Sequence, residues 1–242
     1  MTKGAGSQEP LLQKLELLAE LTDEDRQALA ALPRTTAQVG PGHHLVKEGG
    51  EPTHCCLLLE GYACRYKMSA GGARQIVSFH IAGDILDLQH LLLATADHHV
   101  QTISDATVAW VPQAALRSLC RQRPAIAEAL WKDTLIDASI FREWVLNVGR
   151  RDAKSRIAHM LCEFIVRCEA RGLGSAERLR LPMTQEQIAD ATGLTAVHVN
   201  RMLRALEDEG VIERKGRELV VGDWQRMRRV ADFDPIYLHA AA

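Results

Sequence analysis

Side chains that can read the edges of DNA bases gather in one short stretch of the chain. A predicted helix over residues 195–208 turns four of them outward: His198, Asn200, Arg201 and Arg204. An arginine guanidinium can bind guanine through two hydrogen bonds, an asparagine amide can bind adenine in the same way, and a histidine can donate to a base acceptor or a phosphate. These residue types on one helix face predict contacts to double-stranded DNA.

A second group of side chains suits the phosphate backbone of a duplex. Its members stand at predicted helix starts or in a predicted turn: Thr184, Gln185, Thr195 and Lys215. Hydroxyls, amides and backbone N–H groups at a helix N-terminus bind phosphate oxygens well. The run Arg214–Arg217 places three cations around a glycine. Such contacts would position the protein on DNA without reading its sequence.

The residues that connect these groups have the spacing of a helix-turn-helix. Thr184 and Gln187 can form a capping box at the start of a first helix, and Gly193 supplies the positive φ of a tight turn. The second helix has an apolar inward face: Val199, Met202, Leu203 and Leu206. Two apolar segments, Val211–Ile212 and Leu219–Val221, flank the basic turn and predict a β-hairpin wing. An ordinary helical hairpin, the alternative, does not explain all these requirements together.

The first half of the chain predicts short helices followed by a small β-domain. After a loose tail at residues 1–10, residues 11–32 have leucines at helical spacing. Thr22 and Asp25 can form a capping box there. Short apolar segments separated by glycines then run from about residue 39 to residue 112. This density of strands and turns predicts an antiparallel β-roll, or double-stranded β-helix.

A long helix is predicted from Pro124 to about Asn147, with two apolar stripes. One stripe can cover the β-roll and consists of Ala127, Leu130, Phe141, Trp144 and Val148. The neighbouring stripe consists of Trp131, Leu135, Ala138 and Val145. A second copy of the helix is the simplest partner for this second stripe, which predicts a homodimer. The alternative is a helix packed only within its own chain.

Together these patterns predict an α+β protein in four parts. We expect the following parts: an N-terminal tail and helices at 1–38, a β-roll domain at 39–123, a dimerisation helix and hinge at 124–150, and a winged helix-turn-helix with a C-terminal tail at 151–242. The hinge is expected at Gly149–Asp152. The tail, Asp223–Leu238, is expected to be helical and to pack back on the body.

Composition limits the classes to which the protein can belong. With 47% hydrophobic and 25% charged residues, the 242-residue chain has the profile of a globular protein. No apolar run approaches the roughly 20 residues of a membrane span, and the N-terminus has no signal-peptide core. We therefore expect a cytoplasmic protein without a membrane partner. A net charge of −2 means that DNA contacts need a local basic surface.

Further motifs are spread over the chain: Pro41-Gly42, Glu48-Gly49, Leu57–Gly61, Gly83-Asp84 and Arg156-Ile157-Ala158. With the long helix and the helix-turn-helix, they make the chain similar to Crp/Fnr-type bacterial transcription regulators over nearly its whole length. The resemblance implies a cyclic-nucleotide-binding-like β-roll, a dimerising helix and a winged-helix DNA reader. We expect a sequence-specific regulator, a homodimer that reads an inverted repeat. RNA polymerase is a further candidate partner, and an effector in the β-roll is a candidate control.

One position of the second helix departs from the pattern of this family. A glutamate usually stands four residues before an arginine, and the matching positions here are Val197 and Arg201. A carboxylate can accept a hydrogen bond from cytosine N4, whereas valine cannot. The resemblance therefore predicts a DNA half-site that differs from the usual one.

The β-roll also departs from the pattern of cyclic-nucleotide binders, which use a Gly-Glu pair followed by an arginine. Gly83-Asp84 is followed by Asp87-Leu88, and no lysine or arginine occurs between Arg74 and Arg117. A buried phosphate needs charge-assisted donors, and we expect only histidines and backbone N–H groups to be available. A cyclic nucleotide is therefore disfavoured, and no effector-binding residue is assigned.

No metal cofactor is predicted. The oxygen sensors of the family carry an N-terminal cysteine cluster, but the first cysteine here is Cys55, and its neighbour Cys56 would face the other side of a strand. An iron–sulfur cluster is thus disfavoured, and the six cysteines are expected to be reduced, mostly buried thiols. Seven histidines are expected mainly on the surface, while a haem or metal role stays open: His43, His44, His54, His80, His90, His98 and His99.

Two other classes of protein compete with this interpretation. A cupin-like metalloenzyme would use His43, His44 and Glu48 as ligands, but adjacent histidines on a strand diverge, and an enzyme does not require a winged helix-turn-helix. We therefore do not expect an enzyme. A protein-interaction adaptor that does not bind DNA would leave the cations Arg201 and Arg204 unexplained.

Overall fold

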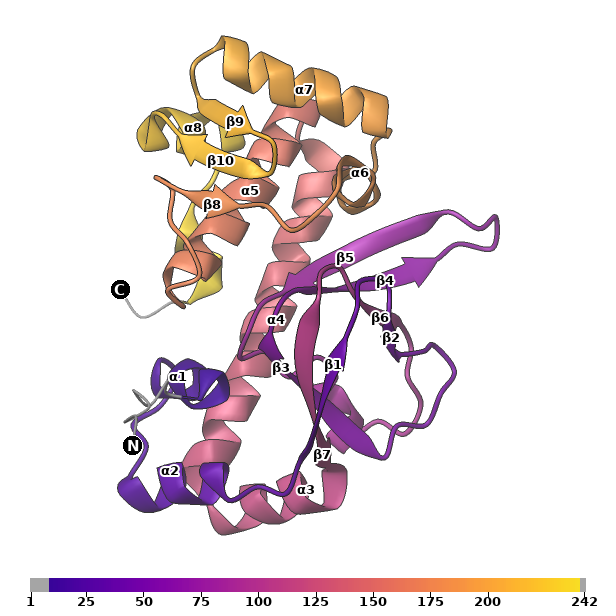
Figure 1. Ribbon diagram of the computed structural model, residues 1–242, viewed down its shortest axis with the longest axis vertical. Coiled ribbons are helices and arrows are strands. Elements are labelled where there is room, and N and C mark those ends of the chain that lie inside the picture. Colours follow the sequence, from indigo (N-terminus) through magenta and orange to yellow (C-terminus); the bar gives the residue numbers. More distant parts are fainter. Residues whose placement is uncertain (1–8, 240–242) are drawn as a thin grey trace, which may run out of the picture.

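The computed structural model describes residues 9–239 as a β-roll and a mostly helical C-terminal unit, joined by one long helix (Figure 1). The roll consists of β1 (Thr35–Val39), β2 (His44–Val46), β3 (His54–Glu60), β4 (Ala63–Met68), β5 (Arg74–His80), β6 (His99–Thr102) and β7 (Ala106–Pro112). These strands form two antiparallel sheets with the orders β1-β7-β3 and β2-β6-β4-β5. The predicted α+β fold with an antiparallel roll is confirmed.

The alternation of side chains along β3 divides the core of this half of the molecule. Cys56 and Leu58 face the interior of the roll, where they meet Val100 and Val108. Cys55 faces the other way, into a cluster with residues of the flanking helices. The two adjacent cysteines therefore lie on opposite faces, as expected, and each is buried in an apolar cluster.

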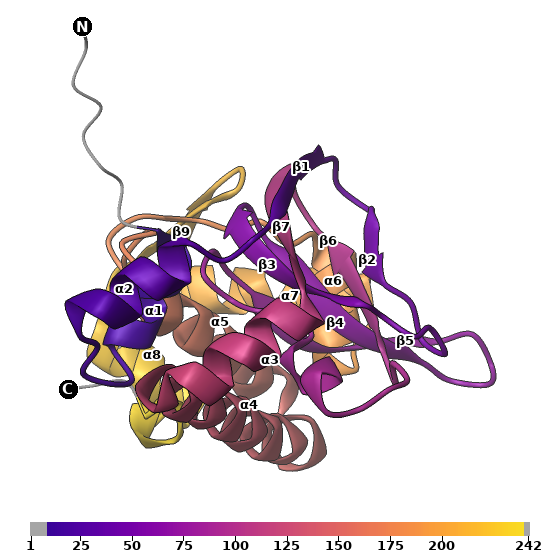
Figure 2. The same cartoon turned by 90° about the horizontal axis from the view of Figure 1, so that it is seen from below.

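The N-terminal helices lie against the long helix and the neighbouring part of the roll, where the first of them contacts both the long helix and β3 (Figure 2). They are α1 (Pro10–Glu16) and α2 (Asp23–Ala30). The capping box of Thr22 and Asp25 at the start of α2 is confirmed. The tail expected at residues 1–10 lies, for residues 1–8, outside the described part of the chain. It ends earlier than expected, because Pro10 already stands in the first turn of α1, where proline is favoured.

The long helix α4 (Pro124–Arg150) follows α3 (Gln113–Gln122) and packs against it. Ile126, Leu130 and Trp144 are buried on its inner face. The chain leaves α4 only at Arg151, so the hinge expected at Gly149–Asp152 begins two residues too early. Glycine weakens a helix by only about 1 kcal/mol, and the neighbouring turn is held by Asn147, whose side chain donates to the Arg156 carbonyl at 3.1 Å.

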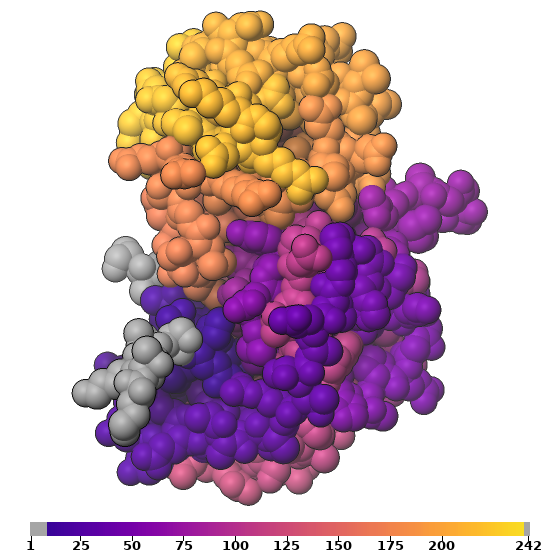
Figure 3. All heavy atoms as spheres, in the orientation of Figure 1, coloured from indigo at the N-terminus to yellow at the C-terminus, as the bar shows by residue number. Residues whose placement is uncertain are grey.

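The C-terminal unit is a winged helix that rests directly on the roll (Figure 3). Its elements are α5 (Ala153–Glu169), β8 (Leu179–Arg180), α6 (Gln185–Thr192), α7 (Ala196–Asp208), β9 (Ile212–Lys215), β10 (Glu218–Val221), α8 (Trp224–Ala231) and the 3-10 turn η2 (Pro235–Leu238). Strand β8 pairs with β10 and was not predicted. The tail is helical and packs on α5 and α4, as expected. No helix within residues 9–239 is long and apolar enough to cross a membrane.

Candidate DNA-binding surface

The turn between α6 and α7 has the geometry of a helix-turn-helix. Thr184 accepts a hydrogen bond from the Gln187 N–H, and the Gln187 side chain accepts one from the Thr184 N–H, which completes the predicted capping box. Gly193 ends α6 in the left-handed conformation with φ 65°. Thr195 then caps α7 by accepting from the His198 N–H at 3.2 Å. Local sequence thus fixes both helix starts and the turn between them.

Helix α7 lies at the end of the molecule remote from the roll (Figure 1). Val199, Leu203 and Leu206 are buried against the body of the unit. Met202, expected to face inward with them, is only half-buried. The opposite face is exposed and includes Val197, 82% accessible.

The eight predicted DNA-contact residues differ in their exposure. Five are exposed: Thr184, Thr195, Arg201, Arg204 and Lys215. Gln185, His198 and Asn200 are half-buried. The Asn200 amide donates to Gln185 Oε1 at 3.2 Å, which joins the start of α6 to the outer face of α7. Asn200 would have to exchange this bond, or share its amide, to pair with adenine.

The wing is a β9–β10 hairpin whose turn contains Gly216 at φ 63°. Lys215 and Arg217 are exposed at its tip. The third cation of the run is engaged elsewhere, because Arg214 Nη2 lies 2.6 Å from Glu207 Oε2 on α7. The run therefore offers two exposed cations to a phosphate backbone, and Arg214 instead fixes the wing to α7.

A half-buried arginine supports the helix-turn-helix from behind. Arg156 on α5 donates from Nη1 to the Thr192 carbonyl at 2.7 Å and from Nη2 to the Arg151 carbonyl at 3.0 Å. It thus binds a free carbonyl at the end of α6, next to the Gly193 turn, and the chain that enters α5. The sequence showed Arg156 only as part of a family motif, and its role depends on partners that are distant along the chain.

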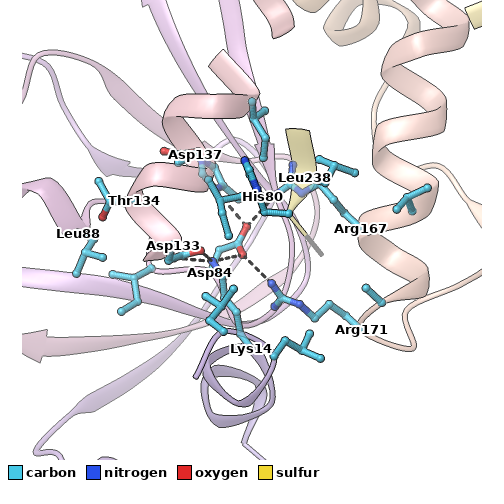
Figure 4. Close-up of a pocket in the computed structure, with 18 of the residues that line it drawn as sticks. Lys14, His80, Asp84, Leu88, Asp133, Thr134, Asp137, Arg167, Arg171 and Leu238 are labelled. Atoms are coloured by element: carbon cyan, nitrogen blue, oxygen red, sulfur yellow. Dashed lines mark hydrogen bonds and ion pairs between the residues drawn. The ribbon is translucent and has the colours of Figure 1, made fainter. Parts of the chain in front are cut away.

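The roll region holds more cations than the sequence indicated. Only histidines and N–H groups were expected as donors there, but Arg65 on β4 is buried and donates to the Leu86 carbonyl at 2.9 Å. Lys14 approaches from α1, Arg167 from α5 and Arg171 from the turn after α5 (Figure 4). The expectation was wrong because a count restricted to residues 74–117 omits donors that other segments bring into place.

These cations converge on Asp84, a buried carboxylate after β5 (Figure 4). Its oxygens lie 2.9 Å from Lys14 Nζ, 3.2 Å from Arg167 Nη2 and 3.3 Å from His80 Nδ1. Burial opposes ionisation of Asp84, but attraction to Lys14, the hydrogen bond with His80 and attraction to Arg167 outweigh it, so the pKa lies well below its usual range. This carboxylate joins the N-terminal helix, the roll and the DNA-binding unit.

The histidines of the roll do not gather into a metal site. No group of three or more His, Cys, Asp or Glu side chains among residues 9–239 could hold a metal ion. His43, His44 and His54 are exposed, as expected. His80 and His98 are buried, contrary to expectation, because each has an aspartate partner, Asp84 and Asp97. His90 is buried as well, and its ring stacks on that of His98 with 6.0 Å between centroids.

Comparison with known families agrees with this division of the molecule. The cyclic nucleotide-binding domain family matches residues 36–123, and the Crp-like helix-turn-helix domain family matches residues 155–230. The first match covers the roll and α3, and the second covers the winged unit from α5 to α8. The protein thus combines a roll of the cyclic nucleotide-binding domain family with a Crp-like helix-turn-helix, the architecture of a DNA-binding regulator.

Comparisons over most of the chain identify individual relatives of the protein. The chain is 29% identical to the nitrogen fixation regulation protein FixK of Rhizobium meliloti, over 74% of this chain and 79% of the relative. It is 24% identical to the transcriptional activator protein anr of Pseudomonas aeruginosa, over 88% and 86%. The solved structure of FixK2 from Bradyrhizobium japonicum superposes with a TM-score of 0.75 at 26% identity, covering 82% of this chain and 98% of that one. The protein is a DNA-binding transcription regulator of the Crp/Fnr family.

Proposed function

We propose that this regulator acts as a homodimer that reads an inverted repeat through α7. The observation that carries this proposal is the exposed apolar stripe of α4, in which Trp131 is 68%, Leu135 55% and Val145 75% accessible. With Ala138, these positions follow spacings of four, three and seven residues, the pattern of a two-stranded coiled coil. A second α4 packed on this stripe would cover it.

A two-fold axis along α4 would relate two copies of the recognition helix α7, one from each chain. Two copies of α7 on one side of a dimer would meet successive major grooves about 34 Å apart. A symmetric protein of this kind selects a site whose halves are inverted copies. The exposed position of α7 at the end of the winged unit leaves it free to enter a groove.

Within each half-site, the structure supports a division of tasks. We assign base contacts to Arg201, with Asn200 and His198 beside it, and we assign Arg204 to the same surface. Phosphate contacts go to the residues at helix starts and at the wing tip: Thr184, Gln185, Thr195 and Lys215. Val197 takes the position where the family usually has glutamate, so the preferred half-site would lack the contact that a carboxylate makes with cytosine.

The proposal also includes the cellular location of the protein and its further partner. A regulator that reads bacterial DNA acts in the cytoplasm, and RNA polymerase is its candidate partner at a promoter. We propose no catalytic role, since the relatives that match are named as regulators.

Selection of bound sequences from a random duplex library tests this proposal. We expect wild type to enrich an inverted repeat with half-sites one helical turn apart. Arg201→Ala should lower affinity for that site by roughly tenfold to a hundredfold and relax the preference at one base pair of each half-site. Arg178→Ala is the matched control, because Arg178 is exposed on the same unit but lies outside the predicted contacts.

The alternative of a protein-interaction adaptor gives a different result. An adaptor would enrich no sequence, and its weak binding to duplexes would be the same for wild type and Arg201→Ala. Enrichment of single half-sites without a repeat would retain the DNA-binding surface and contradict the dimer.

A further inference from the structure

A pocket of about 120 Å³ lies where five segments of the chain meet (Figure 4). These segments are α1, the roll around Asp84, α4, α5 and η2. One wall therefore belongs to the sensor half and another to the DNA-binding unit. A site for one water molecule needs roughly 10–15 Å³ of such volume, so the pocket has room for about ten non-hydrogen atoms.

The charges of the pocket wall do not balance. Its four cations are Lys14, Arg65, Arg167 and Arg171, and its three carboxylates are Asp84, Asp133 and Asp137. Burial lowers the pKa of His80, which is therefore neutral near pH 7. Apart from its histidines, the wall carries one positive charge more than it carries negative charges, and Arg167 has a further carboxylate outside the wall, Glu163, at 3.6 Å.

Arg171 is the most weakly paired cation of the wall. Lys14 is paired with two carboxylates, at 2.9 and 2.6 Å, and Arg65 with Asp137 at 2.7 Å. The nearest carboxylate oxygen to Arg171 among the described residues is that of Asp84, 3.7 Å from Nη2. Nη1 donates to the Ala82 carbonyl at 3.1 Å. A guanidinium has five N–H donors, so Arg171 retains the capacity to bind an anion, and burial lowers its pKa.

Most of the remaining wall is apolar, and Gln89 and Thr134 add polar groups to it. The apolar side chains include Leu17, Leu18, Ile85, Leu88, Ile136, Ile140, Val166 and Leu238. A small number of polar groups in a mainly apolar hollow is typical of sites that bind small organic molecules. The polar end of a ligand would meet Arg171, and its apolar part would meet these side chains.

Gly83 allows α1 and the Arg171 guanidinium to approach the roll closely at the pocket. It has φ +93°, and a Cβ there would lie 2.6 Å from the Pro10 carbonyl oxygen and 2.7 Å from Arg171 Nη1. Any larger residue would displace α1 or the guanidinium at the pocket.

We propose that this pocket binds a small monocarboxylate with an apolar body, its carboxylate paired with Arg171. Arg171 is the cation of the wall with no carboxylate oxygen closer than 3.7 Å, and a charge-assisted, two-pronged pair is the geometry that arginine offers to a carboxylate. Arg167 lies on α5 and Arg171 in the turn that follows it, so the bound molecule would also affect how the DNA-binding unit packs on the roll; this last step rests on the proposed function.

Calorimetric titration without DNA tests the binding step. The probes are butyrate, hexanoate and octanoate, with hexanamide as the neutral probe of equal size. Wild type should bind hexanoate and be stabilised by it in thermal unfolding, and it should not respond to hexanamide. Arg171→Gln should weaken hexanoate binding at least about tenfold. Arg178→Gln, which changes an exposed arginine of the same unit, should leave it unchanged.

Three results would overturn the proposal: no binding of any carboxylate, equal binding of hexanoate and hexanamide, or full binding by Arg171→Gln. If Arg171→Gln does not fold, the comparison of hexanoate with hexanamide in wild type decides whether the proposal holds. Because no duplex is present, failure here leaves the library selection unaffected, and failure of the selection leaves this titration unaffected.

Discussion

At the scale of single residues, the polar side chains around α7 fall into two groups. Some are bound to other side chains of the protein, and others are exposed to solvent. Arg214 is tied to Glu207, and Asn200 to Gln185. Arg201 and Lys215 are exposed and have no ion pair within residues 9–239. The exposed cations can therefore bind DNA without first breaking a salt bridge.

Lys215 at the wing tip allows a test of phosphate contact. Lys215→Ala should weaken binding to all duplexes to a similar extent, because a phosphate contact does not read sequence, and it should reduce the slope of log affinity against log salt by about one per subunit. Titrations at several salt concentrations measure this slope. Lys47→Ala, on the exposed surface of the roll, should leave the slope unchanged. A loss confined to the selected sequence would show that Lys215 reads bases instead.

Val197 allows a test of base preference. Val197→Glu restores the carboxylate that the family usually has, and it should create a preference of about 1–3 kcal/mol for a C·G pair at one position of each half-site. Library selection on wild type, Val197→Glu and Val197→Ala measures the change. An unchanged consensus in the glutamate variant would place Val197 outside the groove. Val197 is 82% accessible, so neither substitution should disturb the core.

His98 should make stability depend on pH. Burial, followed by the charge of Arg65, lowers its pKa to about 4, from an ordinary value near 6.5. The unfolded chain therefore binds a proton at higher pH than the folded one, so stability is complete above pH 6.5 and falls as the pH falls towards 4. Between pH 7 and 5, the loss from this residue is about 2 kcal/mol. Urea unfolding of wild type and His98→Gln at both pH values measures it, and equal losses in the two proteins would contradict the assignment.

At the scale of elements, the helix-turn-helix depends on one backbone conformation. Gly193 has φ 65°, and a Cβ there would meet no atom closer than 3.6 Å, so substitution by alanine adds backbone strain rather than a clash. Gly193→Ala should destabilise the protein by about 1 kcal/mol. Gly149→Ala is the matched control, because Gly149 is helical with no atom near its Cβ position, and this change should stabilise by about 0.5–1 kcal/mol. Chemical denaturation gives both values, and equal effects would contradict the role of φ.

The elements themselves could largely be predicted from sequence. Caps such as Thr22, Thr184 and Thr195 act within three residues, and apolar periodicity marks the strands and the long helix, so local patterns were sufficient. The two-residue strand β8 was missed because it exists only through pairing with β10. The end of α4 was misplaced because the contact of Asn147 with α5 outweighs the weak helix propensity of glycine.

At the scale of the whole molecule, two buried carboxylates join parts that are distant in the sequence. Asp84 joins α1, the roll and α5. Glu163 on α5 accepts hydrogen bonds from Trp144 on α4 and Tyr237 on η2, at 2.9 Å each. Arg167 lies near both carboxylates, 3.2 Å from Asp84 and 3.6 Å from Glu163. No local pattern could reveal these partners, which is why the pocket beside Asp84 was absent from the sequence prediction.

The stripe on α4 gives the prediction that concerns the molecule as a whole. Trp131→Glu places a charge in the interface of the proposed helix pair, where the same charge of the second chain would lie opposite, so the dimer should dissociate at micromolar concentration while each chain stays folded. Sedimentation would show half the mass, and circular dichroism an unchanged helix content. Met68→Glu, an exposed apolar position on β4, should stay dimeric. Because each monomer keeps one α7, the variant should lose affinity for the inverted repeat and keep its weak preference for a half-site. A Trp131→Glu protein that still sediments as a dimer would show that another surface joins the two chains.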